Sequence, residues 1–80
     1  MTKTEYLKKL RHALRQVKAE ERNKSLAYFG EVIDDRMEDG VSEQDALAEL
    51  ESVEAAAERI ISEARAQGQI KPRRSLWEIA

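Results

Sequence analysis

The sequence contains no cysteine, one proline and three glycines, and aromatic residues make up only 5% of its 80 residues. The absence of cysteine excludes a disulfide scaffold and any thiolate metal site, and it favours a reducing compartment. So few turn-forming residues argue against a sheet, which would also need more β-branched side chains. No apolar run approaches the roughly 20 residues of a membrane span, and no signal-peptide core follows Met1. We therefore expect a soluble, helical, cytoplasmic chain.

Charge is abundant but unevenly distributed. Residues 1–30 carry eight Lys/Arg against three Asp/Glu, residues 31–63 carry two against twelve, and residues 64–80 carry four against one. This segregation permits attraction between the basic and acidic parts, within one chain or between chains. Exposed pairs contribute only about 0–1 kcal/mol each, so a simple solvated surface is the favoured explanation of the pattern.

Apolar residues recur at helical spacing from the start of the chain. Thr2 and Glu5 form a capping box, and a stripe follows at Leu7, Leu10, Leu14 and Val17, which predicts a helix over about 3–17. A second helix is expected to begin in the polar passage from Lys18 to Arg22 and to run to about Glu38. Its buried face should consist of Leu26, Phe29, Ile33 and Met37. Gly30 costs such a helix up to about 1 kcal/mol, so it indicates either a close helix approach or tolerated drift.

A short turn is expected after the second helix. Gly40 can end a helix in the left-handed conformation, and Ser42 can cap the following one. We expect a short helix over about 43–50, burying Ala46, Leu47 and Leu50. Ser52 is again a capping residue, and a helix over about 53–67 should follow, ending at Gly68. Its inward residues are predicted to be Val53, Ala56, Ala57, Ile60, Ile61 and Ala64.

These patterns predict an all-α fold, a compact bundle of three to four short helices with an extended or partly helical C-terminal tail. The helical domain is expected to span residues 1–68 and the tail residues 69–80. Pro72 prevents a smooth continuation of the last helix. The tail combines basic Lys71, Arg73 and Arg74 with apolar Leu76, Trp77 and Ile79, so it resembles a juxtamembrane segment contacting anionic lipid. The alternatives are a frayed terminus or a tail that docks Trp77 into a groove of this or a partner chain.

The acidic residues at the end of the second helix form a candidate interaction surface: Glu31, Asp34, Asp35, Glu38 and Asp39. A calcium loop starting at Asp35 would need oxygen ligands at its third and twelfth positions, which are Met37 and Ala46. The only histidine, His12, lies in no Glu-x-x-His motif and has no catalytic partner. We therefore predict no metal site, no cofactor, no catalytic residues and no enzymatic activity.

The basic face of the first helix raises the question of nucleic acid. Its cations are Lys8, Lys9, Arg11, Arg15 and Lys18. Neither a base-reading cluster nor an aromatic platform accompanies them. Direct nucleic-acid binding is therefore not expected, and a small DNA-associated regulatory protein is kept only as an alternative.

The sequence resembles a known family in several motifs. The matching residues are Met1-Thr2-Lys3 with Glu5-Tyr6-Leu7, Glu20-Glu21-Arg22 before Tyr28-Phe29, Asp35-Arg36-Met37-Glu38-Asp39-Gly40 with Ser42-Glu43, and Leu50-x-Ser52-x-Glu54. They resemble the HTH-associated alpha-helical signalling domain, HAAS, over about residues 1–65. The resemblance implies a small cytoplasmic helical module, often the N-terminal part of bacterial membrane proteins whose genes lie beside a PadR-like winged-helix regulator.

The leading hypothesis is therefore a non-enzymatic signalling or protein-interaction module. Its partner would be a winged-helix regulator or a second copy of itself, as a homodimer. The alternative is a membrane-proximal structural adaptor whose tail contacts the inner face of the cell membrane.

Overall fold

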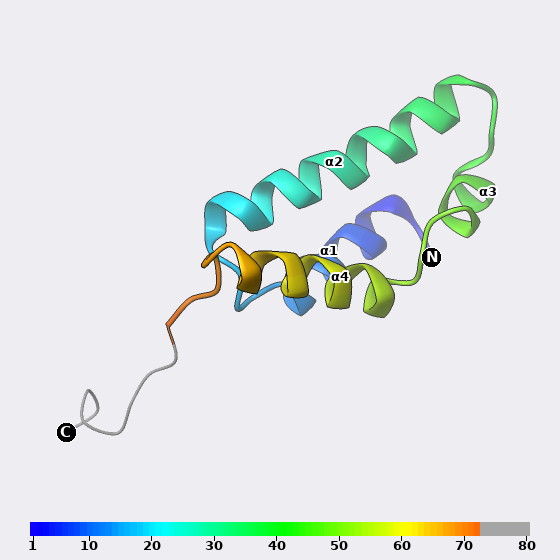
Figure 1. Cartoon of the computed structure of the whole chain (residues 1–80). Coiled ribbons are helices and arrows are strands. Elements are labelled where there is room, and N and C mark those ends of the chain that lie inside the picture. Colours follow the sequence, from blue (N-terminus) through cyan, green and yellow to red (C-terminus); the bar gives the residue numbers. More distant parts are fainter. Residues whose placement is uncertain (73–80) are drawn as a thin grey trace.

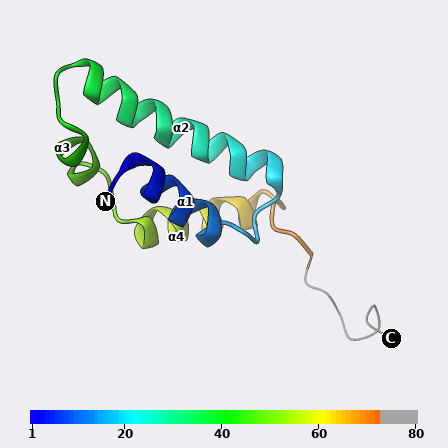
Figure 2. The same ribbon diagram turned by 180° about the vertical axis from the view of Figure 1, so that it is seen from behind.

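The computed structural model describes residues 1–72, and in this part the chain forms four helices joined by short connections (Figure 1). They are α1 (Lys3–Ala13), α2 (Ala19–Glu38), α3 (Glu43–Ala48) and α4 (Val53–Ala66). α1 packs against both α2 and α4, and α3 packs against α2. α1 and α4 run side by side in the same direction, whereas α2 runs back along them (Figures 1 and 2). The all-α bundle predicted from the sequence is confirmed.

The predicted caps are present at three helix starts. Thr2, Ser42 and Ser52 each accept a hydrogen bond from a backbone N–H three residues ahead, at 3.1 Å in every case. Gly40 and Gly68 have φ of +93° and +71°, the left-handed conformation that ends a helix. Local capping chemistry therefore determines where these helices begin and end.

The first helix is shorter than its apolar stripe predicts, because α1 ends at Ala13 and not near Val17. The chain then turns, and Val17 forms an antiparallel bridge with Ile70. The Lys18 N–H donates to the Gln69 carbonyl at 2.8 Å, and the Lys71 N–H donates to the Gln16 carbonyl at 2.7 Å. This pairing requires extended backbone at residues 16–18, which a continued helix would not allow. Leu14 and Val17 nevertheless remain fully buried, as their spacing predicts.

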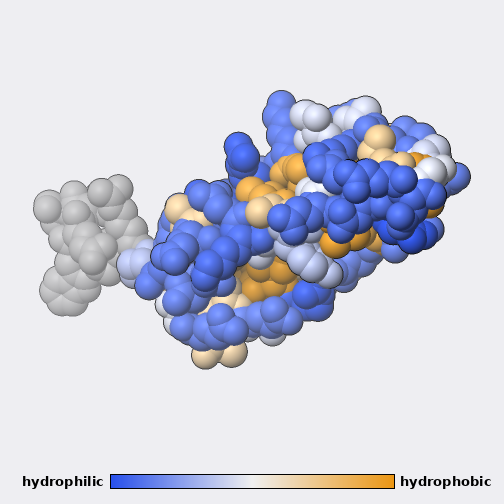
Figure 3. Space-filling model, turned by 90° about the horizontal axis from the view of Figure 1, so that it is seen from above, coloured by the Kyte–Doolittle hydropathy of each residue, from blue (hydrophilic) through white to orange (hydrophobic). Residues whose placement is uncertain are grey.

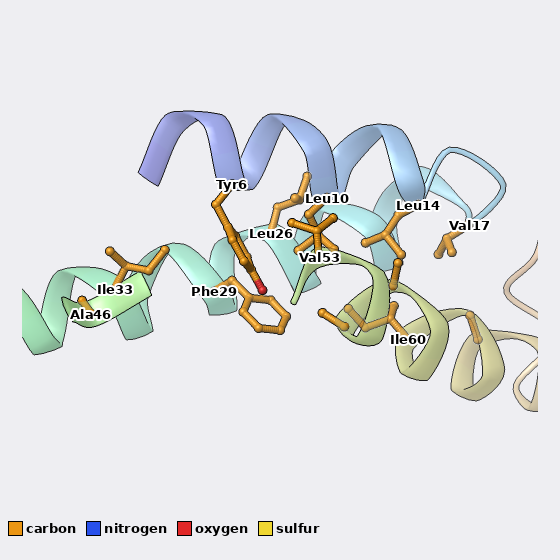
Figure 4. Packing of buried hydrophobic residues seen from close by; sticks show 13 residues of the cluster. Tyr6, Leu10, Leu14, Val17, Leu26, Phe29, Ile33, Ala46, Val53 and Ile60 are labelled. Atoms are coloured by element: carbon orange, nitrogen blue, oxygen red, sulfur yellow. The ribbon is translucent and has the colours of Figure 1, made fainter. Parts of the chain in front are cut away.

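The core lies between α1, α2 and α4 (Figure 4). Leu10, Leu14, Val17 and Ile33 have no exposed surface, and Phe29 and Ile60 are also buried. Tyr6 is buried too, although the predicted stripe omits it. Its ring lies 6.0 Å from that of Phe29, and its hydroxyl donates to the Glu51 carbonyl at 2.9 Å. Burial, reinforced by the nearby Glu51 carboxylate, raises the pKa of Tyr6, which further favours the protonated hydroxyl that donates this hydrogen bond.

The prediction that Met37 belongs to the core is wrong, because this residue is 39% exposed. The Lys3 ammonium lies 2.8 Å from the Asp34 carboxylate, so the first turn of α1 is level with Asp34. The last turn of α2, which holds Met37, extends beyond the start of α1, so α1 does not cover it. Leu7, Leu47, Leu50 and Ile61 are only partly buried at the edge of the core.

Gly30 is buried where α2 faces α1. A Cβ atom added there would lie 3.7 Å from Leu7 Cδ1 and 3.8 Å from Lys3 Cε, which are ordinary van der Waals distances. The helix approach therefore does not require glycine at this position.

We expect Gly30→Ala to raise the free energy of unfolding by up to about 1 kcal/mol, because alanine restricts the unfolded chain and favours helix. The midpoint of thermal unfolding should then rise by about 4–8 °C. Gly40→Ala is the control, since its φ of +93° strains any side chain and should lower the midpoint. A lower midpoint for Gly30→Ala would show that α1 and α2 are packed more tightly than these distances indicate.

Candidate interaction surface

The five predicted acidic residues lie at one end of the bundle, and we refer to Glu31, Asp34, Asp35, Glu38 and Asp39 as the acidic face. The first four are spaced three and four residues apart, so they line one side of α2, whereas the buried Ile33 points to the other. All five side chains are exposed, and Asp39 caps the C-terminal end of the helix. The structure thus brings the predicted residues together on one solvent-facing surface.

Two cations neutralise the borders of the acidic face. Lys3 pairs with Asp34 at 2.8 Å. Arg36 donates two hydrogen bonds to the Glu49 carboxylate at 2.7 and 2.9 Å, and it lies 3.9 Å from Asp39. These hydrogen bonds hold the pKa of Glu49 below its usual value and fix α3 against α2. Neither pairing could be predicted from the sequence, because Arg36 is far from Glu49 along the chain and Lys3 is far from Asp34.

The carboxylates at the centre of the acidic face are not paired with cations within residues 1–72. Among residues 1–72, Glu31, Asp35 and Glu38 take part in no ion pair. Figure 3 views the molecule from the side on which α2 lies in Figure 1. Hydrophilic residues cover most of this side, and apolar side chains are visible between them. Three neighbouring unpaired carboxylates on a rigid helix form a surface that attracts cationic groups.

In the part of the chain that the structure describes, no three histidine or acidic side chains converge closely enough to hold a metal ion. None of the helices within residues 1–72 combines the length and the apolar composition needed to cross a bilayer.

Most of the predicted tail contacts lie outside the described residues. These are Arg73, Arg74, Leu76, Trp77 and Ile79. Lys71 is described: its side chain is exposed, and its backbone is anchored to Gln16. One predicted lipid contact, Lys71, therefore lies in an anchored segment, and the other predicted contacts follow it in the sequence from Arg73 on.

Comparison with known proteins identifies the family of the chain but no individual relative. Neither the curated proteins nor the solved structures contain a match to the chain. The family model described as HAAS matches residues 5–59, which include most of α1, all of α2 and α3, and the first half of α4. Since this match covers more than half of the 80 residues, the protein belongs to the HAAS family.

Proposed function

We propose that this HAAS domain is a non-enzymatic, cytoplasmic signalling module that binds a basic surface of a protein partner through its acidic face. The supporting observation is the row formed by Glu31, Asp35 and Glu38, which are exposed and unpaired within residues 1–72. A solvated surface needs no such clustering, and like charges at helical spacing destabilise the isolated helix. A cationic partner would remove this repulsion on binding.

The kind of partner follows from the charge and from the family. The resemblance described above implies a PadR-like winged-helix regulator encoded beside the gene. A DNA-binding regulator carries a basic surface that neutralises phosphates. The acidic face would occupy part of that surface, so the domain and DNA would compete for the regulator. This competition would convert a binding event at the domain into a change in transcription.

The test uses the purified full chain and the purified regulator, with the dissociation constant measured by titration calorimetry at two salt concentrations. We expect binding that weakens as salt rises. The double variant Glu31→Lys/Asp35→Lys should weaken binding by about tenfold or more, because it places cations against a cationic surface. Addition of the regulator's operator DNA should displace the domain.

The matched control is Glu20→Lys/Glu63→Lys. It reverses two exposed carboxylates, one in the first turn of α2 and one near the end of α4, both away from the acidic face. We expect this change to alter affinity by less than about twofold. Equal effects of the two double variants would show that only net charge matters, and an absence of binding would reject the regulator as the partner.

A further inference from the structure

A second surface of the domain lies along the seam between α1 and α4, apart from the acidic face. Two adjoining open hollows, of about 460 and 700 Å³, share Lys9, Val53 and Glu54 as lining residues. The larger also includes Ala13 in its floor, and a further hollow on α4 adds Ile61. We call this surface the α1–α4 groove. Its floor is apolar, because Ala13 and Ile61 are only partly buried and the buried Val53 lies between the two helices.

The two sides of the groove carry opposite charges. Glu5 on the α1 side and Arg65 on the α4 side also line these hollows, so each side has an excess of one sign and not a single sign. The excess comes from Lys8 and Lys9 on the α1 side and from Glu54 and Glu58 on the α4 side. These four side chains are exposed, and none of them forms an ion pair within residues 1–72. By contrast, Arg59 on the other side of α4 is already paired with Glu51 and Glu63. The groove therefore has unpaired charges of both signs beside an apolar floor.

The two helices are level with each other at both ends. Tyr6 is hydrogen-bonded to Glu51 just before α4 begins, and Val17 is bridged to Ile70 just after α4 ends. α1 and α4 also run in the same direction (Figures 1 and 2). Lys9 and Glu54 each lie three residues beyond the Tyr6–Glu51 contact, and they line the same hollows. Opposite charges therefore face each other across the groove at the same height.

This arrangement is self-complementary. A two-fold axis that runs along the groove, parallel to both helices, places α1 of each copy on α4 of the other at the same level. Each basic edge then meets an acidic edge, and the apolar floors are covered. A two-fold axis perpendicular to the helices would instead place α1 on α1, with like charges opposed. Charge complementarity thus selects one dimer geometry.

We propose that the α1–α4 groove is a homodimer interface in which Lys9 of each copy faces Glu54 of the other. This dimer leaves the acidic face on α2 free, so it does not depend on the proposed regulator binding. Exposed ion pairs contribute little individually, and the apolar floor is small. The dimer should therefore be weak and sensitive to salt, with a dissociation constant between about 10 μM and 1 mM.

The test exploits the two-fold symmetry of the interface. The two-fold axis creates two equivalent contacts between residue 9 of one copy and residue 54 of the other. In the Lys9→Glu dimer both contacts bring two carboxylates together, and in the Glu54→Lys dimer both bring two ammonium groups together. Each variant alone should therefore dimerise at least about tenfold more weakly than the natural chain. An equimolar mixture of the two variants should regain dimers. The carboxylate introduced at residue 9 of one chain then meets the ammonium group introduced at residue 54 of the other. The unchanged Glu54 and Lys9 form the second attractive contact. Sedimentation equilibrium of the full chain measures all three samples.

Arg11→Glu is the matched control. It makes the same charge change in the same helix, at an exposed residue that does not line the groove, and should alter the dissociation constant by less than about twofold. Circular dichroism confirms that each variant is helical. A natural chain that stays monomeric up to about 1 mM would overturn the proposal. So would a mixture that dimerises no better than its two components.

Discussion

Replacing Leu10 with alanine is expected to lower the free energy of unfolding by about 2–5 kcal/mol. Leu10 has no exposed surface and lies in the middle of α1, the helix that packs against both α2 and α4. The substitution removes apolar contacts on both sides and leaves a cavity that only partial relaxation can fill. A domain of this size has a stability of about 5–15 kcal/mol at most, so a large part of it would be lost.

Urea unfolding at 25 °C, followed by circular dichroism, measures this change. Met37→Ala is the control, because it also shortens a large apolar side chain but at an exposed position in the last turn of α2. We expect this control to alter the free energy of unfolding by no more than about 0.5 kcal/mol. Similar losses for the two variants would mean that α2 is covered along its whole length and that Met37 belongs to the core.

Local signals in the sequence were sufficient for most of the helix boundaries. Thr2, Ser42 and Ser52 cap the helices as predicted, and both predicted glycine stops adopt positive φ. These features depend on residues within one turn of each other, so a single sequence contains all the information they require. The spacing of Leu14 and Val17 likewise predicted their burial correctly, although these residues lie beyond the end of α1.

Features that depend on distant partners could not be predicted. A helix that packs against two neighbours buries a wider part of its surface than a helix that packs against one. Because α1 packs against both α2 and α4, its buried surface includes Tyr6. The only sequence signal was that Tyr6 lies four residues before Leu10, on the same helical stripe. In the same way, the spacing on α2 grouped the acidic residues, but only the folded chain shows that Lys3 and Arg36 neutralise the borders of the acidic face.

The end of α1 illustrates the same limit and leads to a further expected result. The three residues after Gly68 are part of the folded domain. Residues 69 and 71 form the two backbone hydrogen bonds with residues 16 and 18, and Ile70 packs against the core beside the fully buried Val17. A chain that ends at Gly68 loses these contacts, and extended residues 16–18 are left without partners.

A chain ending at Gly68 should therefore be less stable than one ending at Pro72 by about 1–3 kcal/mol. Each lost hydrogen bond costs about 0.5–1.5 kcal/mol, and the exposed apolar surface around Val17 adds to this. The chain ending at Pro72 must order residues 69–71 on folding, and this entropy cost offsets part of the difference. Urea unfolding of the two chains isolates the contribution of residues 69–72, because both lack residues 73–80. Equal stabilities would show that the pairing of Val17 with Ile70 adds nothing to the fold, and the early end of α1 would then need a local cause.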